Sequence, residues 1–156
     1  MAYFSGANTK ISVKNKSLIG NYLFNHVEEC SGISFVLNNS QQPIYGYASV
    51  HYDAMLPGRE IIQGNMLINF TKNNYLLDII DSELANAAAQ VSYSQFFSPM
   101  FDIKIEFLRN MGNNEYIILE NCSIISVGTT AQISDQPIME EYSFIGRNLS
   151  IVEQYN

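Results

Sequence analysis

Residues 101–107 read Phe-Asp-Ile-Lys-Ile-Glu-Phe, and this stretch decides the fold class of the chain. Apolar and charged residues alternate strictly. In an extended strand the four apolar side chains therefore point to one side, while Asp102, Lys104 and Glu106 point to the other. Such alternation is typical of a strand that packs one face on a core. The chain is accordingly predicted to be built mainly from β-strands.

The residues that follow this strand predict its hairpin partner. A turn signal, Met-Gly-Asn-Asn, occupies positions 111–114 and precedes an isoleucine-rich stretch, Tyr116–Val127. Two β-prone segments joined by a short turn containing glycine are typical of a hairpin. We expect the strand that ends near Leu108 to pair with Tyr116–Val127.

A second strongly patterned strand is predicted over Arg59–Phe70. Ile62, Met66 and Ile68 fall on one side of it, and mostly polar residues fall on the other. Gly64 lies in its middle and is expected to mark a bulge or bend.

Shorter stretches complete the predicted strands. They are Lys10–Val13, Ile33–Leu37, Pro43–Val50 and Met139–Arg147. A turn is expected at positions 38–41, Asn-Asn-Ser-Gln, because such residues favour turns. The total is about seven strands.

One segment has helical periodicity instead. Within Tyr75–Val91, apolar residues recur every three to four positions, and polar residues take the opposite side. Asn73 or Asn74 could cap its start, and Asp78 would favour the positive end of the helix dipole. We predict one flanking helix whose apolar stripe covers part of a sheet. With no repeats and no linker, residues 1–156 are expected to form a single domain.

Composition excludes several classes of protein. The chain has 156 residues, 47% of them hydrophobic, so a highly charged disordered chain is excluded. Its 15 acidic and 8 basic residues give a net charge of -7, which disfavours avid nucleic-acid binding. The first 20 residues contain three lysines and no long apolar run, so we expect no targeting segment. No stretch is apolar enough to predict membrane insertion.

Motifs for catalysis or cofactor binding are weak or missing. His51 precedes Asp53 by two residues and His26 precedes Cys30 by four, spacings that often arise by chance. Cys30 and Cys122 form no CxxC pair, which predicts neither a disulfide scaffold nor a zinc ribbon and suits a reducing compartment. Phosphate-binding loops and metal-ligand spacings are absent. We expect no enzyme, no cofactor and no metal.

Charge is distributed unevenly along the chain. Lys10, Lys14 and Lys16 lie in an N-terminal region without acids, whereas the residues from 111 onward contain six acids, including Glu140 and Glu141, against one arginine. Opposite patches could meet across a head-to-tail interface between copies. A polarity that serves no partner is an equally good interpretation.

Several segments, taken in order, resemble one protein family. Pro43–Ser49 reads PIYGYAS, Leu56–Arg59 reads LPGR, and Ile62–Phe70 reads IQGNMLINF. Later segments agree with the same pattern: FDIKI at 101–105, CSIISVG at 122–128 and EYSFIGRNL at 141–149. This order is similar to that of tail tube and related virion proteins of tailed phages.

The resemblance implies a small β-sandwich or barrel with one flanking helix, a fold shared with the type VI secretion tube protein. It also implies a virion tail protein, made in the host cytoplasm, whose hexameric rings stack into a channel for DNA ejection. An extended inter-strand loop at 47–58 would reach the neighbouring ring. Its candidate contact residues are Tyr47, His51, Tyr52, Asp53 and Pro57.

Within such a tube, the polar side of 101–107 is a candidate lining of the lumen, because an acidic wall repels phosphates. The expected partners are other copies of the chain, tail sheath and baseplate proteins, and DNA in passage without specific binding. Two alternatives remain open. One is a fold-related component of a tail end, such as a tube initiator, baseplate hub or terminator ring, and the other is a non-viral secretion tube protein.

Overall fold

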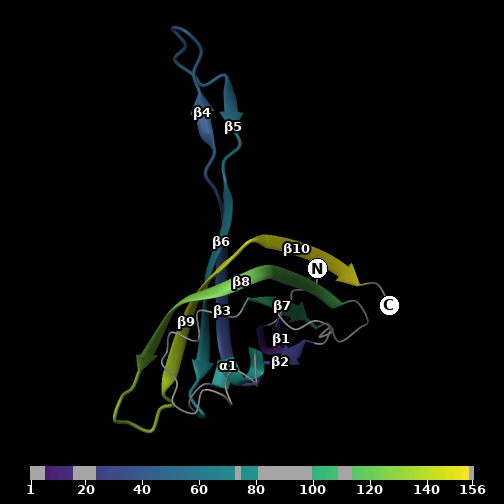
Figure 1. The fold of residues 1–156 in the computed structure, drawn as a ribbon, viewed down its shortest axis with the longest axis vertical. Coiled ribbons are helices and arrows are strands. Elements are labelled where there is room, and N and C mark those ends of the chain that lie inside the picture. The colour runs from purple at the N-terminus through teal and green to yellow at the C-terminus, as the bar shows by residue number, and fades with distance from the viewer. Residues whose placement is uncertain (1–5, 16–23, 73–74, 81–99, 109–113, 155–156) are drawn as a thin grey trace.

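The computed structural model describes residues 6–15, 24–72, 75–80, 100–108 and 114–154. Strands dominate this part of the chain (Figure 1). The elements are η1 (Gly6–Asn8), β1 (Thr9–Asn15), β2 (Asn25–His26), β3 (Cys30–Asn39), β4 (Gln42–Ile44), β5 (Ala54–Leu56), β6 (Glu60–Asn69), α1 (Tyr75–Ile80), β7 (Phe101–Phe107), β8 (Asn114–Thr130), β9 (Met139–Gly146) and β10 (Asn148–Gln154). The predicted fold class, mainly β with one helix, is confirmed.

Eight of these strands form one antiparallel sheet, in the order β2-β1-β7-β8-β9-β6-β3, with β10 also paired to β8. The 17-residue β8 joins its two parts. Residues 114–122 of β8 pair with β7 and β10, and residues 123–130 pair with β9. We call β2, β1, β7, β10 and the start of β8 the first half of the sheet. The second half comprises β3, β6, β9 and the end of β8.

The two halves share one hydrophobic core. Ile103 and Leu119 enter it from the first half, and Ile62 and Phe144 enter it from the second. The short helix α1 adds three buried side chains, those of Leu76, Leu77 and Ile80. Burial of these apolar faces is the main stabilising term of the body. The two layers expected of a sandwich are therefore two halves of one sheet that turns at β8.

The strongest sequence patterns are confirmed. On β7, Ile103 and Ile105 are buried, and β7 pairs with β8 as the predicted hairpin. On β6, Ile62, Met66 and Ile68 point to the core while residues 61, 63, 65 and 67 are exposed. β1, β3 and β9 also occupy predicted stretches.

The prediction of a turn at positions 38–41 is wrong. β3 continues through Asn39, which pairs with Glu60, and after two residues the chain resumes as β4. The reversal comes later, between β4 and β5, so only residues 43 and 44 of the expected strand Pro43–Val50 are extended. Asn38 and Asn39 remain in the ladder because Ile61 and Glu60 are there to pair with them.

Gly64 marks no bulge, because its pairing with Phe35 and Phe144 is in register on both sides. A Cβ at Gly64 would overlap the Ser34 carbonyl oxygen and lie 2.6 Å from Cζ of Phe144. The missing side chain therefore allows close packing, which is the other use of glycine in a strand.

Two further differences concern element number and length. The described residues contain ten strands instead of about seven. The three that were not predicted are the short strands β2 and β5, and β10, which follows β9 after one residue. The helix is described over Tyr75–Ile80, within the predicted stretch Tyr75–Val91. Its expected continuation to Val91 and its cap at Asn73 or Asn74 lie outside the described residues.

Candidate assembly surfaces

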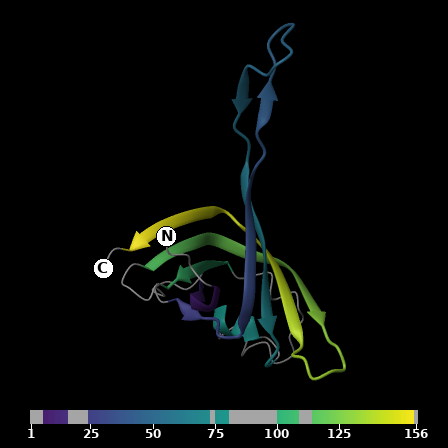
Figure 2. The ribbon, with the colours of Figure 1, turned by 180° about the vertical axis from the view of Figure 1, so that it is seen from behind.

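A two-stranded arm projects from the body (Figures 1 and 2). It continues the β3–β6 hairpin: β9 pairs with β6 no further than Ile62, and the ladder beyond that point has only two strands. The arm ends in β4 and β5, which pair only with each other among the described strands. An isolated two-stranded ribbon is marginally stable at best in water, so a partner surface would stabilise it.

The base of the arm is held by a small set of hydrogen bonds. The Ser40 N–H donates to the Arg59 carbonyl oxygen at 3.2 Å, and the Gly58 N–H donates to Oδ1 of Asn39 at 3.2 Å. A Cβ on Gly58 would overlap the Ser40 carbonyl group. The two segments at the base of the arm therefore approach each other closely only because residue 58 is glycine.

The tip of the arm closes through local polar contacts. The Asp53 N–H donates to the Ile44 carbonyl oxygen at 2.8 Å, and the Ser49 hydroxyl donates to the His51 carbonyl oxygen at 2.6 Å. Ala48 has a φ of 60°, in the left-handed region that alanine rarely adopts. The tip thus has a defined shape that costs some backbone strain.

Large apolar side chains cover the arm without burial in the protomer. Tyr47 and Val50 are 105% and 88% exposed. Between Ile44 and Leu56, the other exposed large apolar residues are Ile44, Tyr45, Tyr52, Met55 and Leu56. A cluster of this kind usually marks a protein interaction site. Sequence reasoning selected Tyr47 and Tyr52 but missed the rest, although their density between Pro43 and Pro57 was a usable signal.

The remaining residues of the predicted inter-ring contact lie on the same arm. His51 and Asp53 are exposed at the tip, and Pro57 is exposed next to its base. Residues 54–56, which were expected to be loop, form β5. The structure thus brings all five predicted contact residues together on one projection.

The second half of the sheet has two open edges. β3 pairs with β6 on one side, and no described strand pairs with its other side. Residues 123–130 of β8 pair with β9 on one side, and none of the described strands pairs with their other side. Ile125, at the irregularity in β8 between Ile124 and Ser126, is 52% exposed. Open edges of this length are templates for pairing with another chain.

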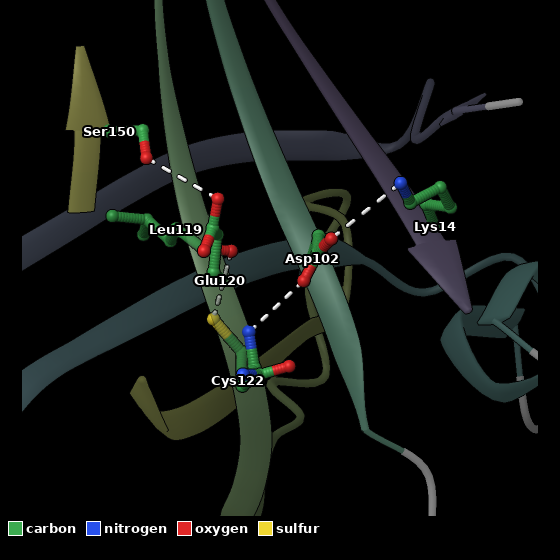
Figure 3. A network of polar contacts seen from close by, with 7 residues as sticks. Lys14, Asp102, Leu119, Glu120, Cys122 and Ser150 are labelled. Atoms are coloured by element: carbon green, nitrogen blue, oxygen red, sulfur yellow. Dashed lines mark hydrogen bonds and ion pairs between the residues drawn. The ribbon is translucent and has the colours of Figure 1, made fainter. Parts of the chain in front are cut away.

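The outer face of the first half carries a polar network (Figure 3). Oδ2 of Asp102 lies 3.7 Å from Nζ of Lys14, and its Oδ1 accepts a hydrogen bond from the Asn121 N–H at 3.0 Å. Asp102 is 3% exposed. The expectation that Asp102 faces a lumen is therefore corrected, because neighbouring groups of its own chain use its carboxylate. Lys104 and Glu106 are half-buried on the same face, and their place in the lining of a lumen stays a prediction.

An aromatic side chain covers part of this face. The Phe24 ring centroid lies 5.0 Å from Nζ of Lys14 and 5.5 Å from Nζ of Lys104. Lys104 is also 4.9 Å from the ring centroid of Tyr116. Contacts of this length between an ammonium and an aromatic ring are attractive. The positive charges here are thus partly engaged within the protomer.

The predicted charge patches are only partly available to a partner. Glu140 is 6% exposed and accepts a short hydrogen bond from the Tyr142 hydroxyl, so its place in a surface patch is corrected. Glu141 is exposed, Lys10 is half-buried, and Lys16 lies outside the described residues. Opposed lysine and glutamate patches therefore remain a prediction with fewer free charges than expected.

The described residues offer little for catalysis. Burial raises the pKa of the Cys30 thiol to about 11 and that of Cys122 to about 12, so both remain protonated at neutral pH and are poor nucleophiles. Both histidines are exposed, at β2 and at the arm tip. No group of three metal-ligating residues occurs in the described part of the chain. None of the helices described there could cross a membrane.

Comparison with known proteins gives similarity in structure alone. No protein-family model matches the chain, and no curated protein matches it by sequence. A chain of the 6-fold symmetrised baseplate of the anti-feeding prophage is similar at TM-score 0.61 and 11% identity, over 97% of both chains. The sheath/tube terminator structure of the PVC extracellular contractile injection system is similar at TM-score 0.60 and 13% identity, over 99% of this chain and 98% of that one.

The SPP1 tail tube is similar at TM-score 0.60 and 9% identity, over 99% of this chain and 81% of that one. Identities this low establish the fold and nothing finer. The resemblance seen in the sequence is thereby confirmed at the level of the fold, which is the one shared by these tail and tube structures.

Proposed function

We propose that this chain, which has the tail-tube fold, is a structural subunit that assembles with copies of itself into hexameric rings that stack into a tube. The observation that carries the proposal is the projecting arm, an isolated ribbon covered with exposed apolar side chains such as Tyr47 and Val50. Within one protomer this surface is costly, whereas on a neighbouring ring it is buried.

Closure of a ring is supported by the two open edges of the second half. β8, β9, β6 and β3 alternate in direction, because each adjacent pair is antiparallel. In a ring with cyclic symmetry, β3 of one copy would therefore meet the end of β8 of the next copy antiparallel. The seam continues the same hydrogen-bonding pattern and removes both edges at once.

Contact between rings is assigned to the arm. It extends beyond the end of β9, where the sheet of its own protomer stops. Its two strands are linked at the base by the close approach of Gly58 and Ser40, which holds the ribbon in line with β3 and β6. The tip residues Tyr47, His51, Tyr52 and Asp53 would contact the next ring.

The proposed place of the protein is the tail of a phage or phage-like particle, with sheath and baseplate proteins as further partners and DNA passing through the channel. No reaction is assigned to the chain. A second candidate is a ring at one end of a tail, favoured by its similarity to baseplate and terminator structures. A tube subunit self-polymerises, whereas an end component forms rings that do not stack.

The test compares the purified chain with a variant in which residues 42–56 are replaced by a short glycine-serine linker. The unmodified chain should form tubes in negative-stain micrographs. The variant should retain the β-sheet circular dichroism of the body, because β4 and β5 pair only with each other among the described strands.

Loss of tubes in the folded variant supports the arm as the contact between rings. Single rings that never stack in the unmodified chain would favour the tail-end candidate. A chain that remains monomeric at every concentration, or a variant that stacks as well as the parent, would refute the proposal.

A further inference from the structure

The core-facing side of β3 is only partly covered in the protomer. Ile33, Phe35 and Leu37 form this side, because each pairs with a residue on the core face of β6. Ile33 and Phe35 are half-buried against the core, and Leu37 is 47% exposed. Since no described strand pairs with the other side of β3, the apolar face of the sheet reaches the surface here.

A groove of about 330 Å³ lies along this side of β3, between it and the strands β1 and β7. Its apolar walls are formed by Ile11, Ile33, Phe35, Ile105 and Phe107. Where β3 begins, the groove is lined by Cys30 and Ser31. An apolar segment that filled the groove would remove these walls from water and stabilise the protomer that holds it.

The arm is long enough to lie along such a groove in a second copy. Residues 50–61 would span about 40 Å if fully extended, against about 25 Å for residues 62–69, the part of β6 that pairs with β9. The arm of one protomer can therefore pass beside most of the sheet of a copy stacked on it.

The arm and the start of the groove lie at opposite ends of the body. β3 begins at Cys30 and leads into the arm after Asn39 (Figure 1). Copies that stack in one orientation make a head-to-tail contact. The arm of one copy then meets the end of the next copy at which Cys30 and Ser31 line the groove.

The charges of the two ends favour this orientation. The arm-bearing end has exposed Arg59 and Arg147 beside Glu60 and the half-buried Glu120, so it is close to neutral. The opposite end carries the acids Glu28, Glu29, Asp135 and Glu141. Lys72, near that end, already has an ion-pair partner in its own protomer. Head-to-tail stacking therefore places arginines against acids, whereas two like ends would bring acids together.

We propose that the groove between β3, β1 and β7 receives the arm of the next copy, a step that rests on the proposed stacking of rings. Leu56, about 20 Å along the arm from Ile62, would lie at the start of the groove, and the tip with Tyr47 would lie toward Leu37. Because the arm packs on the core-facing side of β3, the backbone edge of β3 stays available to a neighbour in the same ring. Each copy gives one arm and receives one.

The experiment cross-links the arm of one copy to the groove of another. In a Cys30→Ser background, Leu56→Cys is combined with Ser31→Cys, and assembled tubes are treated with a short bismaleimide. The matched control carries Ser34→Cys in place of Ser31→Cys, because Ser34 is exposed on the opposite face of the same strand. Cys122 is fully buried and should not react.

Denaturing gels of the paired variant should show a ladder that continues beyond six chains, because each link joins one ring to the next along the tube. The Ser34→Cys control and the variants with one cysteine of the pair should give no ladder. A ladder that ends at six would mean a contact within one ring and would overturn the inference. Equal ladders from Ser31→Cys and Ser34→Cys, or intact tubes without cross-links, would also overturn it.

If the paired cysteines prevent assembly, the Cys30→Ser, Ser31→Cys protein with an unaltered arm decides. Its thiol should react with a maleimide at least about tenfold more slowly in tubes than in the same protein lacking residues 42–56, because the arm covers it. Equally fast reactions would show an uncovered groove, and equally slow ones a groove filled by its own chain, such as residues 1–5 next to Gly6 in its wall. Either result overturns the inference, whereas failure of the unmodified chain to form tubes would refute the proposed function instead.

Discussion

The carboxylate of Asp102 accepts a hydrogen bond from the backbone N–H of Asn121 at 3.0 Å, at the point where β8 passes from the first half of the sheet to the second. Asn121 has a φ of 53°, in the left-handed region that asparagine tolerates better than most residues. The register between β7 and β8 shifts at the same place, between Phe101 and Ile103. A charged side chain of one strand therefore stabilises the bend of its neighbour (Figure 3).

Replacing Asp102 with alanine should lower the free energy of unfolding by about 3 kcal/mol, because it leaves the Asn121 N–H without its acceptor and Lys14 without its counter-ion. Asp102→Asn should cost less, since an amide oxygen can still accept from Asn121 but cannot pair with Lys14. Urea titration of the three proteins followed by circular dichroism checks this order. Glu106→Ala, on the same face of β7 but half-buried, is the control. A loss in Asp102→Ala no larger than in Glu106→Ala would contradict the assigned role.

Gly64→Ala should destabilise the fold by roughly 1 to 3 kcal/mol, the usual cost of forcing extra volume into a packed region. The new methyl group would meet the Ser34 carbonyl oxygen and the ring of Phe144, which is buried and cannot move freely. Gly128→Ala is the matched control, because a Cβ there meets nothing within 4 Å. Thermal unfolding of both variants measures the difference. Equal melting temperatures would show that the close approach at Gly64 is relieved without cost.

The patterns that predicted β6 and β7 succeeded because each strand packs one face on a core. Its own sequence therefore alternates between apolar and polar residues with a period of two. The reversal of the β3–β6 hairpin was misplaced for a related reason. Asn38 and Asn39 have turn propensity, but cross-strand partners at Ile61 and Glu60 outweigh it. A local signal cannot report whether a distant strand is long enough to pair.

The burial of Asp102 and Glu140 could not be predicted from the sequence either. Alternation places Asp102 on the polar side of β7 correctly, yet whether that side meets solvent depends on Lys14 and Asn121, which are far away in the chain. The arm could be predicted in part. Its apolar residues are visible in the sequence, but their lack of burial is a tertiary fact.

The stability of the protein should fall as the pH rises from about 9 toward 12, in part through Cys122. Burial, with a smaller contribution from the charge of Asp102, raises the pKa of this thiol from 9.0 to about 12. The unfolded chain therefore loses the thiol proton at a lower pH than the folded chain does. The contribution of Cys122 to the free energy of unfolding is thus complete below pH 9 and is lost as the pH rises toward the pKa of the folded state. The difference in unfolding free energy between the parent and Cys122→Ala should narrow over this range. A constant difference would contradict the raised pKa.

Gly58→Ala should impair stacking while leaving the body stable. A Cβ at position 58 would overlap the backbone carbonyl group of Ser40, which cannot rotate away as a side chain could, so the two strands at the base of the arm must separate. β4 and β5 pair only with each other among the described strands, so this change should not reach the core, and the melting temperature should stay within a degree or two. Tube length in negative-stain micrographs should fall severalfold, because the arm would approach the next ring at an altered angle. Gly6→Ala, where a Cβ meets nothing within 4 Å, controls for the added methyl group. Full-length tubes from Gly58→Ala would mean that the direction of the arm is set by the neighbouring ring and not by its own base.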